Sequence, residues 1–179
     1  METVYIDPAA GLIQQCLNGD QAAYAELYGR YSRAMLNTAF RVVNDREAAE
    51  DILQESFISA FRNLGRYRAD SSFGAWIKRI VVNRSISWLR QQRTVSLDQA
   101  DDVATEPESE GPDLPCTAEQ VRTAIFQLPD GYRTVLSLYL LEGYDHEEIG
   151  QILGISESTS KSQFSRARKK LISILKSNT

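Results

Sequence analysis

Six lysine and arginine side chains lie in residues 159–179, and no acidic residue occurs among them. Both side chains bind phosphate oxygens, and arginine can also donate two hydrogen bonds to a guanine edge in the major groove. This concentration of basic residues in one segment therefore indicates nucleic-acid binding. The six residues are Lys161, Arg166, Arg168, Lys169, Lys170 and Lys176.

The residues around this segment predict a helix, a tight turn and a second helix. An apolar stripe at helical spacing precedes Gly154, which stands where a left-handed C-cap would end the first helix. Ser156 can cap the next helix, which we expect to begin at Thr159 and to end at about residue 175. A basic second helix in such a motif typically enters the major groove of DNA. The stripe consists of Ile149, Ile152 and Leu153.

The net charge of −4 is unevenly distributed along the chain. Residues 62–93 hold eight basic residues and a single acid, whereas residues 96–120 hold eight acids and no base. Local charge decides phosphate binding, so two basic segments are expected to contact nucleic acid on either side of an acidic spacer. The spacer is rich in proline and poor in large apolar groups, so we expect a flexible linker over residues 96–116.

The remaining segments predict helices only, so the expected fold class is all-α. We expect one small helical domain over residues 1–95, the linker, and a second domain over residues 117–179. Asp20 and Asp45 are placed to cap helices, and the helix after Asp45 is expected to bury an apolar stripe that includes Phe57 and Ile58. Besides the helix-turn-helix, the predicted helices cover residues 8–17, 20–43, 45–61, 73–91, 118–127 and 132–141, with a loop over 66–72 and a turn over 128–131.

Other classes of function lack the residues that they need. Cys16, Cys116 and the single His146 are too few and too scattered for a zinc site, and we expect neither a metal nor a cofactor. No catalytic constellation and no glycine-rich phosphate loop can be identified, so no enzyme is expected. No stretch approaches the roughly 18 apolar residues of a membrane span. Residues 1–20 lack the basic n-region of a signal peptide, so we expect a cytoplasmic protein without a membrane contact of its own.

Four groups of residues form a set of motifs along the chain. They are residues 45–57, with Ala49-Glu50-Asp51, Gln54-Glu55 and Phe57; residues 73–80, followed by Asn83 and Leu89-Arg90; Leu128-Pro129; and residues 144–168, which end on Arg166-Ala-Arg168. In this order and at these spacings they resemble bacterial sigma factors of the extracytoplasmic-function (ECF) group of the sigma-70 family. Those proteins have only the second and fourth sigma domains, joined by a linker. The resemblance covers about residues 20–93 and 117–175.

The resemblance implies a protein that binds RNA polymerase core and directs promoter-specific transcription initiation. The exposed face of the helix over residues 45–61 would bind polymerase by docking on a coiled coil of the largest subunit. The polymerase flap would be a second contact. Without the resemblance, Glu50, Asp51 and Glu55 would more often be a solvated surface near a helix N-terminus. Ile52, Leu53 and Phe57 are expected to divide between core and contact. The polymerase-binding candidates are Glu50, Asp51, Gln54 and Glu55.

Promoter melting and recognition of the −10 element would fall to the loop over residues 66–72 and the helix after it. Basic groups hold a single strand, and aromatic rings can stack on its bases. Asn83 and Arg84 are expected to face the element, whereas Phe73 and Trp76 are expected to be core. Tyr67 either stacks on a base or closes the loop. The −10 candidates are Arg66, Tyr67, Arg68, Lys78, Arg79, Asn83 and Arg84.

The −35 element would be read by the second helix of the C-terminal motif. Arg166 is the candidate for a bidentate guanine contact, while Thr159, Arg168 and Lys169 are better suited to phosphate. Lys170 is either a phosphate contact or a solvated residue that complements the helix dipole. Phe164, Ala167 and Leu171 are expected on the inner face. The −35 candidates are Thr159, Lys161, Ser162, Ser165, Arg166, Arg168 and Lys169.

Two alternatives remain open at this point. A helix-turn-helix regulator that never becomes a polymerase subunit would need a sensory or phosphoacceptor domain, and residues 1–90 show no alternation of strands and helices. A sigma-like protein without promoter binding is the second alternative, because Ser160 and Gln163 depart from the usual aliphatic and basic residues of the family. The resemblance also implies an anti-sigma factor as a partner, beside polymerase core and promoter DNA.

Overall fold

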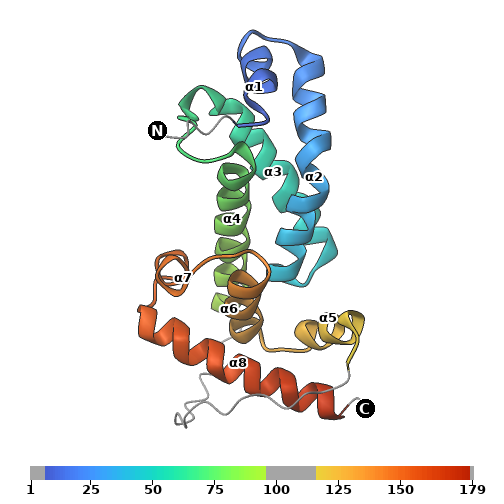
Figure 1. Cartoon of the computed structure of the whole chain (residues 1–179), viewed down its shortest axis with the longest axis vertical. Helices are drawn as coiled ribbons and strands as arrows, with labels where there is room; N and C mark the ends of the chain where they lie inside the picture. The colour runs from blue at the N-terminus through green and yellow to red at the C-terminus, as the bar shows by residue number, and fades with distance from the viewer. Residues whose placement is uncertain (1–6, 96–115, 178–179) are drawn as a thin grey trace, which may run out of the picture. The chain divides into compact units, whose positions relative to one another are not determined.

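The computed structural model describes residues 7–95 and 116–177, and every regular element in these two ranges is helical (Figure 1). The expected all-α fold class is therefore confirmed for the described residues. Residue contacts divide the chain into two units, Met1–Trp88 and Leu89–Thr179, with the boundary inside α4 (Phe73–Val95). The predicted linker lies outside the described residues, apart from Cys116.

The first unit begins with helices whose ends follow local capping rules. Asp20 Oδ1 accepts a hydrogen bond from the Ala22 amide at 2.9 Å, and Asp45 Oδ1 accepts one from the Ala48 amide at 2.9 Å. Asn44 ends α2 in the left-handed conformation, with φ of 54°. Both predicted caps and the predicted break are thus confirmed. The elements are α1 (Ala10–Leu17), α2 (Gln21–Val43), α3 (Arg46–Arg62), the 3-10 helix η1 (Leu64–Arg66) and α4.

The core of the first unit lies where α2 packs against α3, and it extends to the start of α4. Phe73, the first residue of α4, is fully buried, and its ring centroid lies 5.2 Å from that of Tyr31 on α2. Each large apolar side chain removed from water contributes about 1.5–3 kcal/mol to folding. The buried side chains of this core include Leu27, Val42, Ile52, Leu53, Phe57, Phe73, Ile77 and Val81.

Three expectations about side chains in this unit need correction. Ile58 is 50% exposed rather than buried, because helical spacing puts it on the polar side of α3 beside Gln54. Phe57 and its neighbours Ile52 and Leu53 all face the core, so they do not divide between core and contact. Trp76 is only half-buried, although Phe73 is core as predicted.

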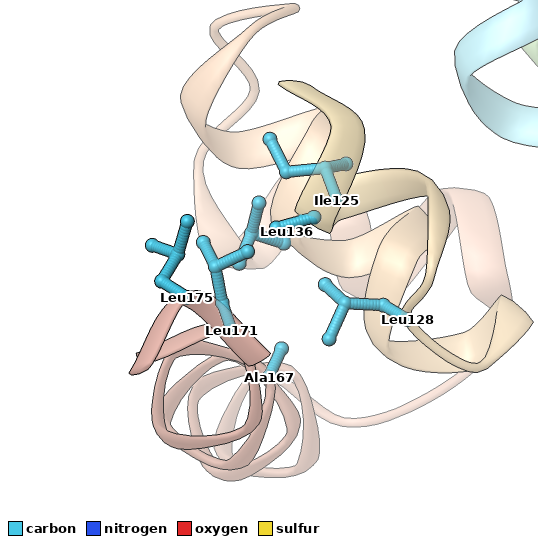
Figure 2. Packing of buried hydrophobic residues seen from close by; sticks show 7 residues of the cluster. Ile125, Leu128, Leu136, Ala167, Leu171 and Leu175 are labelled. Carbon is cyan, nitrogen blue, oxygen red and sulfur yellow. The ribbon is translucent and has the colours of Figure 1, made fainter. Parts of the chain in front are cut away.

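The second unit packs three shorter helices against one long helix. α8 (Glu157–Ser177) contacts α5 (Ala118–Phe126), α6 (Asp130–Leu140) and α7 (His146–Leu153). In Figure 2, Ile125, Leu128 and Leu136 from the shorter helices and their connection lie against the apolar face of α8. The predicted inner face of the helix is confirmed, with Phe164 partly buried. That face consists of Ala167, Leu171 and Leu175 in the core and of Phe164 packed against it.

The turn between α5 and α6 is shorter than predicted. α6 starts at Asp130, so that residue and Gly131 belong to the helix rather than to the turn. An acidic residue in the first turn is favoured by the helix dipole. Arg133, which is almost fully buried, donates hydrogen bonds to the Leu128 carbonyl at 3.2 Å and to Asp130 Oδ1 at 2.7 Å. The arginine therefore holds the turn closed from within the helix.

Candidate nucleic-acid and protein interfaces

The helix-turn-helix has hydrogen-bonded caps at each of its junctions. Asp145 and Glu148 form a reciprocal capping box at the start of α7, at 2.8 and 2.9 Å. Gly154 ends α7 with φ of 69°, and Ser156 Oγ accepts a hydrogen bond from the Thr159 amide at 3.0 Å. The predicted stop and cap are both confirmed, although α8 starts two residues earlier than expected.

Gly150 allows the turn to approach α7 closely. A Cβ atom at this position would lie 2.8 Å from the Ile155 carbonyl oxygen and 3.5 Å from the Glu157 amide nitrogen. The Ile155 amide donates to the Gly150 carbonyl at 3.0 Å, which holds the turn at this distance. Gly150 is one of the residues that our sequence analysis missed. A glycine inside a strongly amphipathic helix was the available signal.

His146 connects the first turn of α7 to α8. Its Nδ1 lies 2.9 Å from Ser160 Oγ, and Ser160 is fully buried. The imidazole stacks on the Tyr139 ring, with centroids 4.5 Å apart and planes 16° apart, and it meets the Phe164 ring edge-on at 5.5 Å. No role for this histidine follows from the sequence alone. The signal was the unusual serine at position 160, whose hydroxyl needs a buried polar partner.

The −35 candidates lie on the part of α8 that points away from the apolar core of the second unit. Lys161 is exposed, and its Nζ pairs with Glu157 Oε1 at 2.6 Å, a hydrogen bond that raises the pKa of the lysine. Ser162 donates its hydroxyl proton to the Thr159 carbonyl at 3.0 Å. Arg166 is partly buried. Of the rest, Thr159 and Ser165 are partly buried, whereas Arg168 and Lys169 are exposed. Lys170, for which the sequence allows a phosphate contact or a solvated residue, is also exposed.

The segment from the last residue of η1 to the start of α4 holds three of the −10 candidates. Arg66 and Arg68 are exposed, whereas the ring of Tyr67 lies against Phe73 and Trp76, with centroid distances of 6.0 and 5.4 Å. The Tyr67 hydroxyl is also hydrogen-bonded within the unit. In this structure Tyr67 therefore closes the loop, and base stacking by this residue stays a prediction.

The −10 candidates on α4 do not share one face. Helical spacing puts Arg79 and Asn83, both exposed, on the same side of the helix. Lys78 is turned to another side, where it is half-buried. Arg84 reaches α3 and pairs with Glu55, its Nη1 2.9 Å from Oε2. The two residues expected to face the −10 element together, Asn83 and Arg84, thus have different surroundings.

The four polymerase-binding candidates lie together on α3, and all of them are exposed. Glu50 pairs with Arg46 at 2.6 Å, one turn earlier on the same helix, and Glu55 pairs with Arg84. Ile58 adds an exposed apolar side chain to this acidic face. An acidic helix face with an apolar residue at one end is suited to docking on a complementary protein surface.

Two known protein families match the chain. Residues 27–95 match the family described as Sigma-70 region 2, and residues 118–171 match the family described as Sigma-70, region 4. The chain is 31% identical over 170 residues to the RNA polymerase sigma-H factor of Pseudomonas aeruginosa, with 88% of each chain covered. It is 30% identical over 173 residues to the ECF RNA polymerase sigma factor SigW of Bacillus subtilis, covering 89% of this chain and 92% of SigW.

Solved structures share the fold. The sigma factor RpoE, determined with the anti-sigma factor NepR from Bartonella quintana, superposes with a TM-score of 0.58 and 23% identity, covering 86% of this chain and 96% of RpoE. CnrH, determined with the cytosolic domain of CnrY, gives a TM-score of 0.57 and 24% identity, covering 94% of this chain and 97% of the other.

The chain therefore belongs to the ECF group of the sigma-70 family. It is an RNA polymerase sigma factor, which associates with the polymerase and directs promoter-specific initiation. The alternative of an independent helix-turn-helix regulator is not favoured, because the region 2 match occupies the segment where such a regulator needs its sensory domain.

Proposed function

We propose that the sigma activity of this chain is divided among three surfaces with separate tasks. The acidic face of α3 binds polymerase core, the loop before α4 and the exposed side of α4 bind the melted −10 element, and α8 reads the −35 element. The observation that carries this proposal is the orientation of α8, which turns its apolar residues into the core and leaves its four lysines and Arg168 exposed, with Arg166 partly buried. A recognition helix needs that division between its two faces.

The polymerase-binding surface consists of Glu50, Asp51, Gln54 and Glu55, with Ile58 as an apolar contact at its end. Their shared exposure supports this role, because a protein interface needs side chains that the fold itself does not use. The coiled coil of the largest polymerase subunit is the proposed partner of this face. The second unit would contact the polymerase flap.

The −10 surface combines the loop arginines with the polar side of α4. Arg66 and Arg68 are exposed at one end, and Arg79 and Asn83 are exposed along the helix, so a single strand could follow them. Tyr67 would meet a base only if its ring left the contacts with Phe73 and Trp76. Arg84 would exchange its partner Glu55 for a phosphate.

The −35 surface is centred on the outer side of α8. Arg166 is proposed to read a guanine, which is worth about 1–3 kcal/mol of discrimination. Lys161 and Ser162 would reach the groove close to it, and Ser165 lies one turn after Lys161. Thr159, Arg168 and Lys169 would hold phosphates and so set the register of the helix.

The domain boundaries at 95/96 and 116/117 belong to the same proposal. With an acidic linker between them, two weak DNA-binding units would bind a promoter together only when polymerase holds both. An anti-sigma factor would act by covering the polymerase-binding faces. Among the described residues, no helix is both long and apolar enough to cross a membrane. We propose a cytoplasmic protein that catalyses no reaction itself.

Run-off transcription with purified core polymerase and promoter fragments tests this assignment. We expect the wild-type chain to start transcripts at defined positions. Arg166→Ala should lower −35-dependent initiation while core binding persists, and Asp51→Ala should weaken core binding. Arg122→Ala and Glu119→Ala are matched controls, because both residues are exposed on α5 outside the proposed surfaces. Equal loss of activity in the control variants would refute the assignment of these surfaces.

A further inference from the structure

Asp7 connects the N-terminal segment to the loop between η1 and α4. Its side chain is only 5% exposed, and both carboxylate oxygens accept hydrogen bonds. Oδ1 accepts from the Ala9 amide at 2.8 Å, a local hydrogen bond in the turn before α1. Oδ2 accepts from the Phe73 amide at 2.6 Å and from the Tyr67 hydroxyl at 2.6 Å. One carboxylate thus contacts residues 60 and 66 positions later in the sequence.

These two distant partners stand at opposite ends of the same loop. Tyr67 directly follows η1, and Phe73 is the first residue of α4. The Tyr67 hydroxyl also lies 2.5 Å from the Ser71 carbonyl oxygen, so the ring spans the loop as well. Between them, Ala69 adopts the left-handed conformation with φ of 57°, which is unfavourable for a residue with a Cβ atom. The Asp7 carboxylate therefore closes a loop whose backbone is partly strained.

The loop presents its two arginines on either side of the residue that Asp7 holds. Arg66 and Arg68 are exposed, whereas Tyr67 is turned inward against Phe73 and Trp76. Arg66 is the last residue of η1 and Arg68 directly follows Tyr67, so the backbone that carries both arginines is held by the inward contacts of Tyr67. The direction of the two guanidinium groups consequently depends on the bond between Tyr67 and Asp7.

We propose that Asp7 is a positioning residue for single-stranded promoter DNA. Its carboxylate holds both ends of the loop and so fixes the orientation in which Arg66 and Arg68 meet the strand. This inference rests on the proposed role of the loop in −10 binding. It assigns to the segment before α1 a part in promoter opening, in addition to its contact with α2.

A local role, in which Asp7 merely accepts the hydrogen bond from the Ala9 amide, can be separated from this one. Serine at position 7 can still accept from the amide two residues later, but it is too short to reach Phe73 and Tyr67. Asp20 supplies a matched control. Its Oδ1 accepts from the Ala22 amide in the same local geometry, and it is exposed at the start of α2. Asp20→Ser therefore repeats the local change without touching the loop.

The experiment uses holoenzyme assembled from core polymerase and the full-length chain. A promoter that the wild-type holoenzyme opens is first mapped with permanganate, and a labelled oligonucleotide is made from its non-template −10 strand. Its affinity is measured by fluorescence anisotropy for the wild type, Asp7→Ser, Asp20→Ser, Tyr67→Phe and the Asp7/Tyr67 double variant. Affinity for core polymerase is measured in parallel for each variant.

We expect Asp7→Ser to weaken oligonucleotide binding roughly tenfold, because the charge-assisted hydrogen bonds that hold the loop are lost. The affinity for core polymerase should stay unchanged. Asp20→Ser should leave both affinities unchanged. The double variant should lose no more than Asp7→Ser alone, within about twofold, because the two side chains act through one contact.

Wild-type affinity in the Asp7→Ser holoenzyme would overturn the inference and leave the −10 role of the loop intact. A parallel loss of core affinity would also overturn it, because the residue would then merely stabilise the unit. If the wild-type holoenzyme opens the promoter but fails to bind the strand, the −10 role and this inference both fall.

Discussion

Arg84 on α4 pairs with Glu55 on α3, with 2.9 Å between Nη1 and Oε2. The arginine is a candidate for DNA binding and the glutamate is a candidate for polymerase binding. The ion pair therefore joins two proposed surfaces of the first unit. Both side chains are substantially exposed, at 37% and 66%, so solvent screens their attraction.

For this pair we predict a small effect on stability. A double-mutant cycle with Arg84→Ala and Glu55→Ala, followed by urea unfolding, should give a coupling energy of about 0–1 kcal/mol. Any large loss of transcription in the single variants would then reflect contacts to DNA or polymerase. A coupling energy well above that range would instead show that the pair is structural.

Gly150→Ala should damage the helix-turn-helix. The added Cβ meets the backbone of the turn at 2.8 Å, and a backbone atom cannot move aside as a side chain can. We expect a loss of about 1–3 kcal/mol in the free energy of unfolding, together with weaker binding to −35 duplex DNA. Urea denaturation measures the loss of stability, and a gel shift with the holoenzyme measures DNA binding.

Gly29→Ala is the control for this substitution. Gly29 is exposed on α2, and a Cβ there would meet nothing within 4 Å. Alanine in an exposed helix should raise stability by roughly 0.5–1 kcal/mol. If both alanine variants changed the free energy of unfolding alike, the close approach at Gly150 would not be the cause of the destabilisation.

His146→Ala should destabilise the second unit by about 1–3 kcal/mol, since it leaves the buried Ser160 hydroxyl without its partner. It also removes the stacking with Tyr139. The additional change Ser160→Ala should recover part of the loss, because no polar group is then buried unpaired. Chemical denaturation of the full chain measures both effects. If the double variant were no more stable than His146→Ala alone, the result would argue against the hydrogen bond.

The contribution of Asp7 to stability should depend on pH. Burial acts to raise the pKa of its carboxyl, but hydrogen bonds from Tyr67 and from the Ala9 and Phe73 amides outweigh that effect and hold the pKa below 3.8. The folded state therefore binds this proton less readily than the unfolded state. The stabilisation is fully present above pH 3.8 and is lost as the pH falls through the folded-state pKa.

Urea unfolding of the wild type and of Asp7→Ser over a series of pH values tests this prediction. The difference in unfolding free energy should be constant near neutrality and should shrink below about pH 4. Tyr67→Phe removes one of the hydrogen bonds that lower the pKa of Asp7, so the stability lost on acidification should be smaller in that variant. A difference that grew on acidification would contradict the assignment.

Features that depend on neighbouring residues were predictable from the sequence. The caps at Asp20, Asp45 and Ser156 and the left-handed Gly154 each involve hydrogen bonds or conformations within one helical turn. The same holds for the apolar stripe of α8, since helical spacing alone puts its members on one side.

The sequence by itself thus determined the helices, the caps just named, the charge of each segment and the family. The tertiary structure decided which faces meet: it paired Arg84 with Glu55, buried Ser160 beside His146 and exposed Ile58. It also brought Asp7 to Phe73, across most of the first unit. The reason is physical. A cap is formed by atoms a few bonds apart, whereas a contact between distant residues exists only once the packing of every helix has fixed where each side chain lies.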